Sequence, residues 1–277
     1  MPDPRGVLFE ALREAGDVIR RGLHRPKHTT FKDSPINLVT AVDRASEKLI
    51  VKIIKKHFPD HNFLTEEGTV PTPSLPPRGG GCRMGGGFKW IVDPLDGTTN
   101  YAHSFPQVAV SIGLEKDGKM KLGGVYDPFR EELFFAEKGR GAYLKTRRST
   151  VRLAVSGTKH LDEALLLTGF PYDRRQRADF YLKFVAAFMK HIQGIRRAGA
   201  AALDLCWVAC GRVDGYWEWR LKPWDVAAGS LIVEEAGGRM TDFLGKPFNP
   251  YGIQTLASNA RIHKEMLKVL KKAGLKE

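Results

Sequence analysis

Apolar and polar positions alternate along the first part of the chain with a helical period. In residues 7–19 the apolar side chains recur every three or four positions, which predicts an amphipathic helix. A second pattern of this kind runs from about residue 41 to residue 58. Thr40 fits the N-cap of this helix, and Asp43 stands three residues later in its first turn. The chain therefore begins with two helices.

Two short strand-like runs come next, and each ends directly in acidic residues. Residues 62–64 precede Glu66, and residues 90–92 precede Asp93 and Asp96. Because α/β proteins usually place their sites at the ends of strands, we expect these carboxylates to converge on the edge of a crevice.

The rest of the chain alternates between strand and helix patterns. A hairpin is predicted at residues 108–114 and 120–126, around the turn Asp117-Gly118, with a further strand at 133–136. Helices are predicted at residues 179–191, 199–210 and from Asp225 to the Gly237-Gly238 stop, strands at 215–219 and 255–257, and a basic helix at the end. This alternation predicts an α/β fold with mixed sheets and antiparallel hairpins.

The composition allows a large buried core. With 277 residues, 42% of them hydrophobic, we expect one domain over residues 1–277, with halves of about 1–150 and 151–277. No apolar run approaches the length of a bilayer span, and the first residues do not resemble a signal peptide. Three cysteines provide no disulfide framework, so we expect a cytoplasmic protein without a membrane partner.

The chain carries a formal net charge of +13, from 44 basic and 31 acidic residues. A nucleic-acid interface favours one dense stripe of basic residues with interleaved aromatics. Here the basic residues form small groups and no such stripe. An anionic small substrate, or simply a basic soluble surface, explains the charge balance as well. The Gly-rich residues 71–87 lead into a strand and not a helix, so we interpret them as a surface loop and not a phosphate-binding loop.

The acidic residues indicate a metal site. Clustered carboxylates repel one another, and a hard divalent cation offsets that repulsion. Magnesium prefers carboxylates, waters and phosphate oxygens. Asp43 and Asp225, taken singly, are better explained as structural residues at helix N-termini. Asp93 and Asp96, which flank a Pro-Leu turn, are interpreted as functional, because the helix start at Thr98 offers backbone N–H groups to a phosphate.

Four segments carry a specific resemblance. Residues 90–100 (WIVDPLDGTTN) and 224–229 (WDVAAG), with 38–43 (LVTAVD) and 63–68 (FLTEEG), are similar in sequence and order to the inositol monophosphatase family of magnesium-dependent, lithium-sensitive phosphatases. The resemblance implies a layered αβαβα sandwich, a homodimer, and hydrolysis of inositol 1-phosphate or a similar phosphorylated polyol or sugar.

The resemblance also implies a set of metal ligands. Glu66, Asp93 and the Leu95 carbonyl would hold one Mg²⁺, while Asp93, Asp96 and Asp225 would hold a second. A weaker third ion would lie near Glu66. Two such ions can stabilise both the attacking and the leaving oxygen of an in-line displacement.

The catalytic residues implied by the family pattern are Thr98, Asp43 and Glu66. Thr98 and Asp43 would orient the attacking water and accept its proton, so no covalent intermediate is needed. Lys32 aligns with a basic residue that lies near the metals in the family, although it equally suits a surface lysine.

Substrate contacts are implied over a wider set of residues. Gly199, Ala200, Ala201 and Glu218 match the family segment that contacts the inositol hydroxyls. Ala200 stands where the family often has Thr or Ser, and Glu218 equally suits a strand residue that faces water. The remaining implied contacts are Asp96, Gly97, Thr98 and Asp225.

Two rival functions stay open. Fructose 1,6-bisphosphate is an alternative substrate, because Arg174, Arg175, Arg196 and Arg197 could bind a second phosphate. A regulatory protein that binds RNA or the transcription machinery is a second alternative, because some bacterial members of the family resemble this chain and the net charge is +13.

Overall fold

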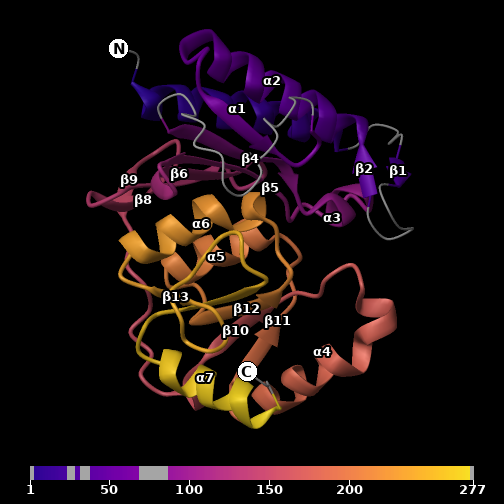
Figure 1. Cartoon of the computed structure of the whole chain (residues 1–277), viewed down its shortest axis with the longest axis vertical. Helices are drawn as coiled ribbons and strands as arrows, with labels where there is room; N and C mark the ends of the chain where they lie inside the picture. Colours follow the sequence, from indigo (N-terminus) through magenta and orange to yellow (C-terminus); the bar gives the residue numbers. More distant parts are fainter. Residues whose placement is uncertain (1–2, 24–28, 32–37, 69–86, 275–277) are drawn as a thin grey trace, which may run out of the picture.

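The computed structural model describes residues 3–23, 29–31, 38–68 and 87–274. In this part of the chain, helices and sheets alternate in five layers: a helix pair, a seven-stranded sheet, a second helix pair, a five-stranded sheet and two outer helices (Figure 1). This is the layered αβαβα arrangement that the sequence predicted. Lys32 and nearly all of the Gly-rich segment 71–87 lie outside the described residues.

The first layer contains the two predicted N-terminal helices, α1 (Pro4–Gly22) and α2 (Ala41–His57). Asp3 caps α1 by accepting hydrogen bonds from the backbone N–H groups of Arg5 and Gly6. The apolar stripe of α1 is fully buried against α2 and the seven-stranded sheet. Ahead of α2 lies a small antiparallel pair, β1 (Thr29–Phe31) and β2 (Leu38–Thr40).

The seven-stranded sheet has the order β3-β4-β5-β6-β7-β8-β9, with β3 parallel to β4 and all other pairs antiparallel. Its strands are β3 (Asn62–Thr65), β4 (Phe88–Asp96), β5 (Ala109–Lys116), β6 (Lys119–Asp127), β7 (Glu132–Glu137), β8 (Gly141–Lys145) and β9 (Thr150–Arg152). The short helix α3 (Thr98–Ala102) joins β4 to β5. The predicted hairpin is the β5–β6 pair.

Between the two sheets lie α5 (Ala201–Ala209) and α6 (Pro223–Glu235), both almost entirely apolar. They bury one face against each sheet, which explains why neither helix shows an amphipathic pattern. This middle layer brings the start of each helix next to the end of β4, where the Ala202 N–H of α5 meets Asp96 and Asp225 of α6 meets Asp93.

The five-stranded sheet has the order β11-β10-β12-β14-β13 and mixes parallel and antiparallel pairs. Its strands are β10 (Leu165–Thr168), β11 (Gly194–Arg196), β12 (Gly215–Trp219), β13 (Arg239–Thr241) and β14 (Gln254–Ser258). The helices α4 (Arg174–Met189) and α7 (His263–Lys272) cover its outer face around an aromatic core. A 3₁₀ turn, Leu161–Glu163, precedes β10.

Several predicted boundaries differ from the structure. The predicted Pro-Leu turn after residue 92 is part of β4, which continues in extended form to Asp96 with a register shift between Asp93 and Asp96. The chain turns only at Gly97, whose φ of 89° is unfavourable for other residues. The helix expected from residue 199 begins at Ala201, because Ala200 is still extended.

Two further helices begin earlier than predicted. The helix expected near residue 179 starts at Arg174, and the one expected from Asp225 starts at Pro223, which suits the first position of a helix. The strands β1, β2, β8 to β11 and β13 were not predicted; each has only three to five residues, and most of them show few alternations.

Candidate active site

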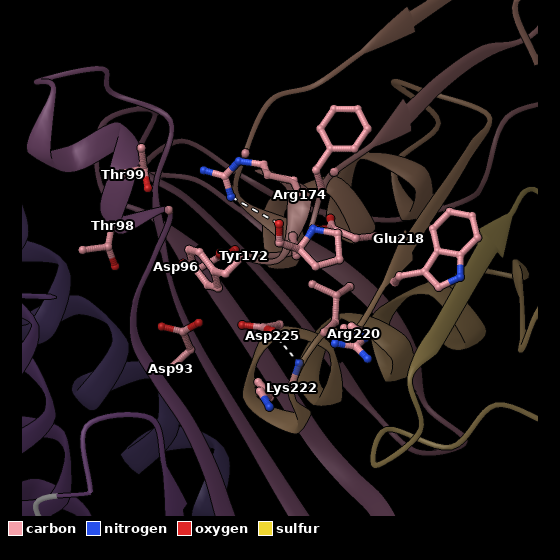
Figure 2. A pocket seen from close by; sticks show the side chains of 18 of the residues that line it. Asp93, Asp96, Thr98, Thr99, Tyr172, Arg174, Glu218, Arg220, Lys222 and Asp225 are labelled. Atoms are coloured by element: carbon pink, nitrogen blue, oxygen red, sulfur yellow. Dashed lines mark hydrogen bonds between the residues drawn. The ribbon is translucent and has the colours of Figure 1, made fainter. Parts of the chain in front are cut away.

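A cavity of about 600 Å³ lies where the two halves of the layered fold meet. Its walls come from the end of β4, the start of α3, the segment after β10, the segment before α5 and the start of α6. Figure 2 shows the acidic side chains Asp93, Asp96 and Asp225 pointing toward one another inside it. Strand and helix ends thus converge on one crevice, as expected for α/β proteins.

Three carboxylates form the centre of this cavity. Asp93, Asp96 and Asp225 each offer an oxygen, and these atoms lie within 4.8 Å of one another. Asp93 and Asp96 lie on β4 and are buried, whereas Asp225 stands on the first turn of α6 and is partly exposed to the cavity. The three residues come from two segments that are far apart in the chain, so their approach depends on the packing of α6 against β4 and β5.

Burial raises the pKa of all three carboxylates. Burial raises the pKa of Asp93 well above its ordinary value, and the charges of Glu66, Asp96 and Asp225 raise it further. Burial and the charge of Asp225 do the same for Asp96. Burial raises the pKa of Asp225 to about 7, although the backbone N–H of Lys222 opposes the shift. Such a cluster is electrostatically unfavourable without a cation, so these residues fit a divalent metal ion.

Glu66 also lines the cavity and follows β3 directly. Its backbone N–H donates to the Val92 carbonyl at 3.2 Å, which keeps it beside β4. The buried Glu47 of α2 fixes the residues on either side of Glu66. It accepts hydrogen bonds from the Thr65 hydroxyl at 3.0 Å and from the Glu67 backbone N–H at 2.7 Å.

Thr98 and Asp43 are in direct contact although they lie in different elements. The Thr98 hydroxyl is 3.0 Å from Asp43 Oδ1 and 3.1 Å from the Leu95 carbonyl oxygen. Asp43 Oδ2 accepts from the backbone N–H and the hydroxyl of Thr40, at 2.8 and 2.5 Å. Asp43 therefore forms the predicted capping box and also contacts Thr98, so the two interpretations of Asp43 are compatible. Burial raises its pKa, while the hydrogen bonds from Thr40 and Thr98 oppose the shift.

The start of α5 contacts the acidic cluster. The backbone N–H of Ala202 donates to Asp96 Oδ2 at 2.7 Å, and a helix N-terminus favours a carboxylate at this position. Gly199 and Ala201 line the cavity, whereas Ala200 is fully buried and does not. Asn100 ties this segment to α3 by donating to the carbonyls of Ala198 and Gly199.

Glu218 faces the cavity and not bulk water (Figure 2). Its Oε2 accepts a hydrogen bond from the buried Tyr216 hydroxyl at 2.6 Å. Burial raises the pKa of Glu218 to about 7, and the hydroxyl of Tyr216 and the charges of Arg197 and Arg174 lower it. This position is not that of a strand residue facing bulk water, and the contact of Glu218 with substrate stays a prediction.

The four arginines proposed for a second phosphate separate into two pairs. Arg174 and Arg197 line the cavity. Arg175 and Arg196 are exposed and do not line it, and Arg196 donates to the adjacent Ile195 carbonyl.

Sequence reasoning missed one wall of the cavity, residues 169–173 between β10 and α4. Gly169 and Tyr172 belong to this segment. Sequence reasoning also missed Tyr216, whose hydroxyl donates a hydrogen bond to Glu218. The apolar run at residues 165–167, followed by Thr168 and Gly169, was a signal for a buried strand that leads into a loop.

Comparison with known proteins gives a consistent result. The model of the inositol monophosphatase family matches residues 5–274. An inositol-1-monophosphatase of Synechocystis sp. is 45% identical over 270 residues, which cover 95% of this chain and 87% of that protein. Nus factor SuhB of Pseudomonas aeruginosa is 43% identical over 242 residues, or 86% of this chain and 85% of that protein. The crystal structure of extragenic suppressor protein SuhB from Bartonella henselae superposes with a TM-score of 0.86 at 37% identity, covering 98% of this chain and 99% of that one.

Proposed function

The chain belongs to the inositol monophosphatase family, and we propose that it is a Mg²⁺-dependent phosphatase that hydrolyses a phosphorylated polyol, namely inositol 1-phosphate. One observation supports this most directly: the carboxylates of Asp93, Asp96 and Asp225 converge within 4.8 Å inside a cavity large enough for a small sugar-like substrate.

The metal ions would be held by the residues at the end of β4 and around it. Asp93, Asp96 and Asp225 suit one Mg²⁺, and Asp93 with Glu66 and the Leu95 carbonyl suits another; a third, weaker ion would lie near Glu66. When bound, Mg²⁺ neutralises charge on the phosphoryl group and lowers the pKa of coordinated water.

The chain's own residues would orient the attacking water. Thr98 Oγ1 donates to Asp43 Oδ1, which leaves the hydroxyl lone pairs free to accept a hydrogen bond from a water in the cavity. The raised pKa of Asp43 makes its carboxylate a better proton acceptor. Gly97 and Thr98 at the start of α3 would bind phosphate oxygens, while Glu218, Gly199 and Ala201 would contact the polyol.

A phosphate-release assay tests this proposal. Inositol 1-phosphate, glucose 6-phosphate and adenosine 3′-monophosphate would be incubated with the protein, with and without Mg²⁺. We expect Mg²⁺-dependent release from inositol 1-phosphate above the other two. Equal turnover of all three esters, or release that persists in excess EDTA, would contradict the proposal.

A second candidate is binding to RNA or the transcription machinery. It is supported by relatives named Nus factor SuhB and by the net charge of +13. Retention on RNA that falls with salt, and that persists in an Asp96→Asn variant without activity, would support this role. Absence of any retention at low salt would exclude RNA binding.

The proposal includes a homodimeric assembly and a cytoplasmic location. Among the described residues, no helix is long and apolar enough to cross a bilayer. Cys206 and Cys210 are both free, as expected where thiols stay reduced. Light scattering at several protein concentrations would measure the oligomeric state.

A further inference from the structure

A second cavity, of about 240 Å³, is lined by residues of α1 and of the strands β6 to β8 with their connecting turns. It has no lining residue in common with the cavity that holds the acidic cluster. Six of its lining residues are charged, and the cations outnumber the acids: Arg13, Arg20, Lys145 and Arg147 against Asp17 and Glu131. Positive charge is therefore in excess in this second cavity.

Both acids of the second cavity are engaged by one arginine of α1. Glu131 Oε1 accepts from Arg20 Nη1 at 2.8 Å, and Asp17 Oδ1 accepts from Arg20 Nη2 at 2.7 Å. Glu131 Oε1 also accepts from Arg147 Nη2 at 2.5 Å. These contacts hold Arg20 on the cavity wall and occupy the two carboxylates.

Arg13 and Lys145 have no such counter-charge. Across residues 3–23, 29–31, 38–68 and 87–274, no acid forms an ion pair within 4.0 Å with either of them. Arg13 is exposed on α1, whereas Lys145 is half-buried as the last residue of β8. Two cations from different layers of the fold thus border the second cavity without a bonded carboxylate.

Tyr126 of β6 supplies a hydroxyl to the same cavity. It is 8% exposed, and its ring packs directly on α1, because a side chain at Gly16 would lie 2.5 Å from two ring carbons. The hydroxyl makes no hydrogen bond with the part of the chain that the structure describes. Burial raises the pKa of Tyr126, and the four charges that also act on it belong to residues that line the cavity. A buried hydroxyl without a partner is costly, so an acceptor oxygen at this place would be stabilised.

These three groups suit an anion with several oxygens. The guanidinium presents a fork of N–H donors that matches the oxygens of a phosphate, the ammonium adds a point charge, and the phenol donates a further hydrogen bond. A cation would meet the excess of positive charge, and an apolar ligand would have to desolvate a wall of charged side chains.

We propose that Arg13, Lys145 and Tyr126 form an anion-binding site, separate from the active site, for a dianionic phosphate group. The free ion and the end group of a small phosphate ester present the same oxygens to these residues. The site does not depend on hydrolysis at the acidic cluster, so it can be tested apart from the proposed function.

Calorimetric titration of the whole protein in EDTA tests the site, with inorganic phosphate and with glycerol 3-phosphate as separate probes. EDTA removes the metal through which the acidic cluster would hold phosphate. We expect saturable binding, and the probe with the lower Kd shows whether the free ion or the ester is preferred. Tyr126→Phe, Arg13→Gln and Lys145→Gln should each raise Kd by about tenfold, because each removes a donor to a charged ligand. Tyr143→Phe and Arg148→Gln, which alter residues outside both cavities, are the matched controls and should keep the wild-type Kd.

Tyr126→Phe retains the ring that packs on Gly16, so weaker binding in this variant reports the hydroxyl and not a loss of folding. The site is overturned if neither probe binds saturably, or if Kd is unchanged in all three variants. It is also overturned if Arg197→Gln abolishes the binding, because the anion would then occupy the active-site cavity. Binding in EDTA by a protein that hydrolyses no ester would support this site and refute the proposed function, whereas hydrolysis without such binding would refute the site alone.

Discussion

The hydroxyl of Thr98 donates a hydrogen bond to Asp43 Oδ1 at 3.0 Å across 55 residues of sequence. Asp43 is held in place by Thr40 at the start of α2, while Thr98 begins α3 directly after the bend at Gly97. The contact therefore couples the first helical layer to the edge of the cavity.

We expect Asp43→Asn and Thr98→Ala to lower kcat by about 10²- to 10⁴-fold, because each removes a step in the transfer of the proton from water. Thr98→Ser keeps the hydroxyl and should retain most of the activity. Phosphate release and thermal melting would be measured together. A Thr98→Ala variant with nearly normal kcat would show that Thr98 does not orient the water.

Removing one carboxylate of the cluster should separate activity from stability. We expect Asp93→Asn to lower activity by at least about 100-fold. Its melting temperature in EDTA should stay the same or rise, because repulsion from Glu66, Asp96 and Asp225 is relieved.

The same melting experiment has a second readout. Mg²⁺ at about 100 times its dissociation constant should stabilise the wild type by about 2.7 kcal/mol and Asp93→Asn by much less. The exposed Asp162 offers a matched control, and Asp162→Asn should behave like the wild type. Normal Mg²⁺-dependent turnover in Asp93→Asn would contradict the metal assignment.

The Tyr216–Glu218 pair predicts a pH dependence of substrate binding. The pKa of Glu218 is raised to about 7, so its carboxylate is neutralised as the pH falls through about 7. If the charged form binds the polyol hydroxyls, KM should rise in that direction, by about 10- to 100-fold once a charged hydrogen bond is lost. Tyr216→Phe removes a donor that lowers this pKa, so the midpoint should move to higher pH.

Glu218→Gln is the control for that profile, because it retains the titration of the substrate phosphate and of the remaining groups. Its KM should lack the step near pH 7. A wild-type profile that coincides with that of Glu218→Gln would show that Glu218 does not contact the substrate.

Gly169 leaves room for the Glu218 carboxylate. A side chain at Gly169 would collide with both Glu218 oxygens, so Gly169→Ala should displace the carboxylate and raise KM by several fold to about tenfold, with a smaller change in kcat. Gly157→Ala is the matched control, since nothing lies within 4 Å of a side chain added at Gly157. Equal kinetics for both variants would contradict the role of Gly169.

The local pattern of the sequence was sufficient for much of the fold. The apolar stripe of α1 and the capping box of α2 are visible in short windows, and so is the β5–β6 hairpin, because each depends on residues only a few positions apart. The predicted element boundaries were wrong where contacts between distant residues determine the backbone conformation. β4 continues through Pro94 because β5 pairs with its far end at Asp96, and nothing near Pro94 in the sequence specifies that pairing.

By itself, the sequence determined which residue types carry the chemistry: acids at the ends of strands, and a motif specific enough to indicate a family. Tertiary structure alone decided which of them meet. Asp225 reaches Asp93 because the apolar α6 packs between the two sheets, and Glu218 faces the cavity because of the pairing of β12. Arg174 and Arg197 line the cavity, whereas the adjacent Arg175 and Arg196 do not. The hydrophobic periodicity of a segment indicates which face of that one element is buried. The convergence of distant residues depends instead on how whole layers pack.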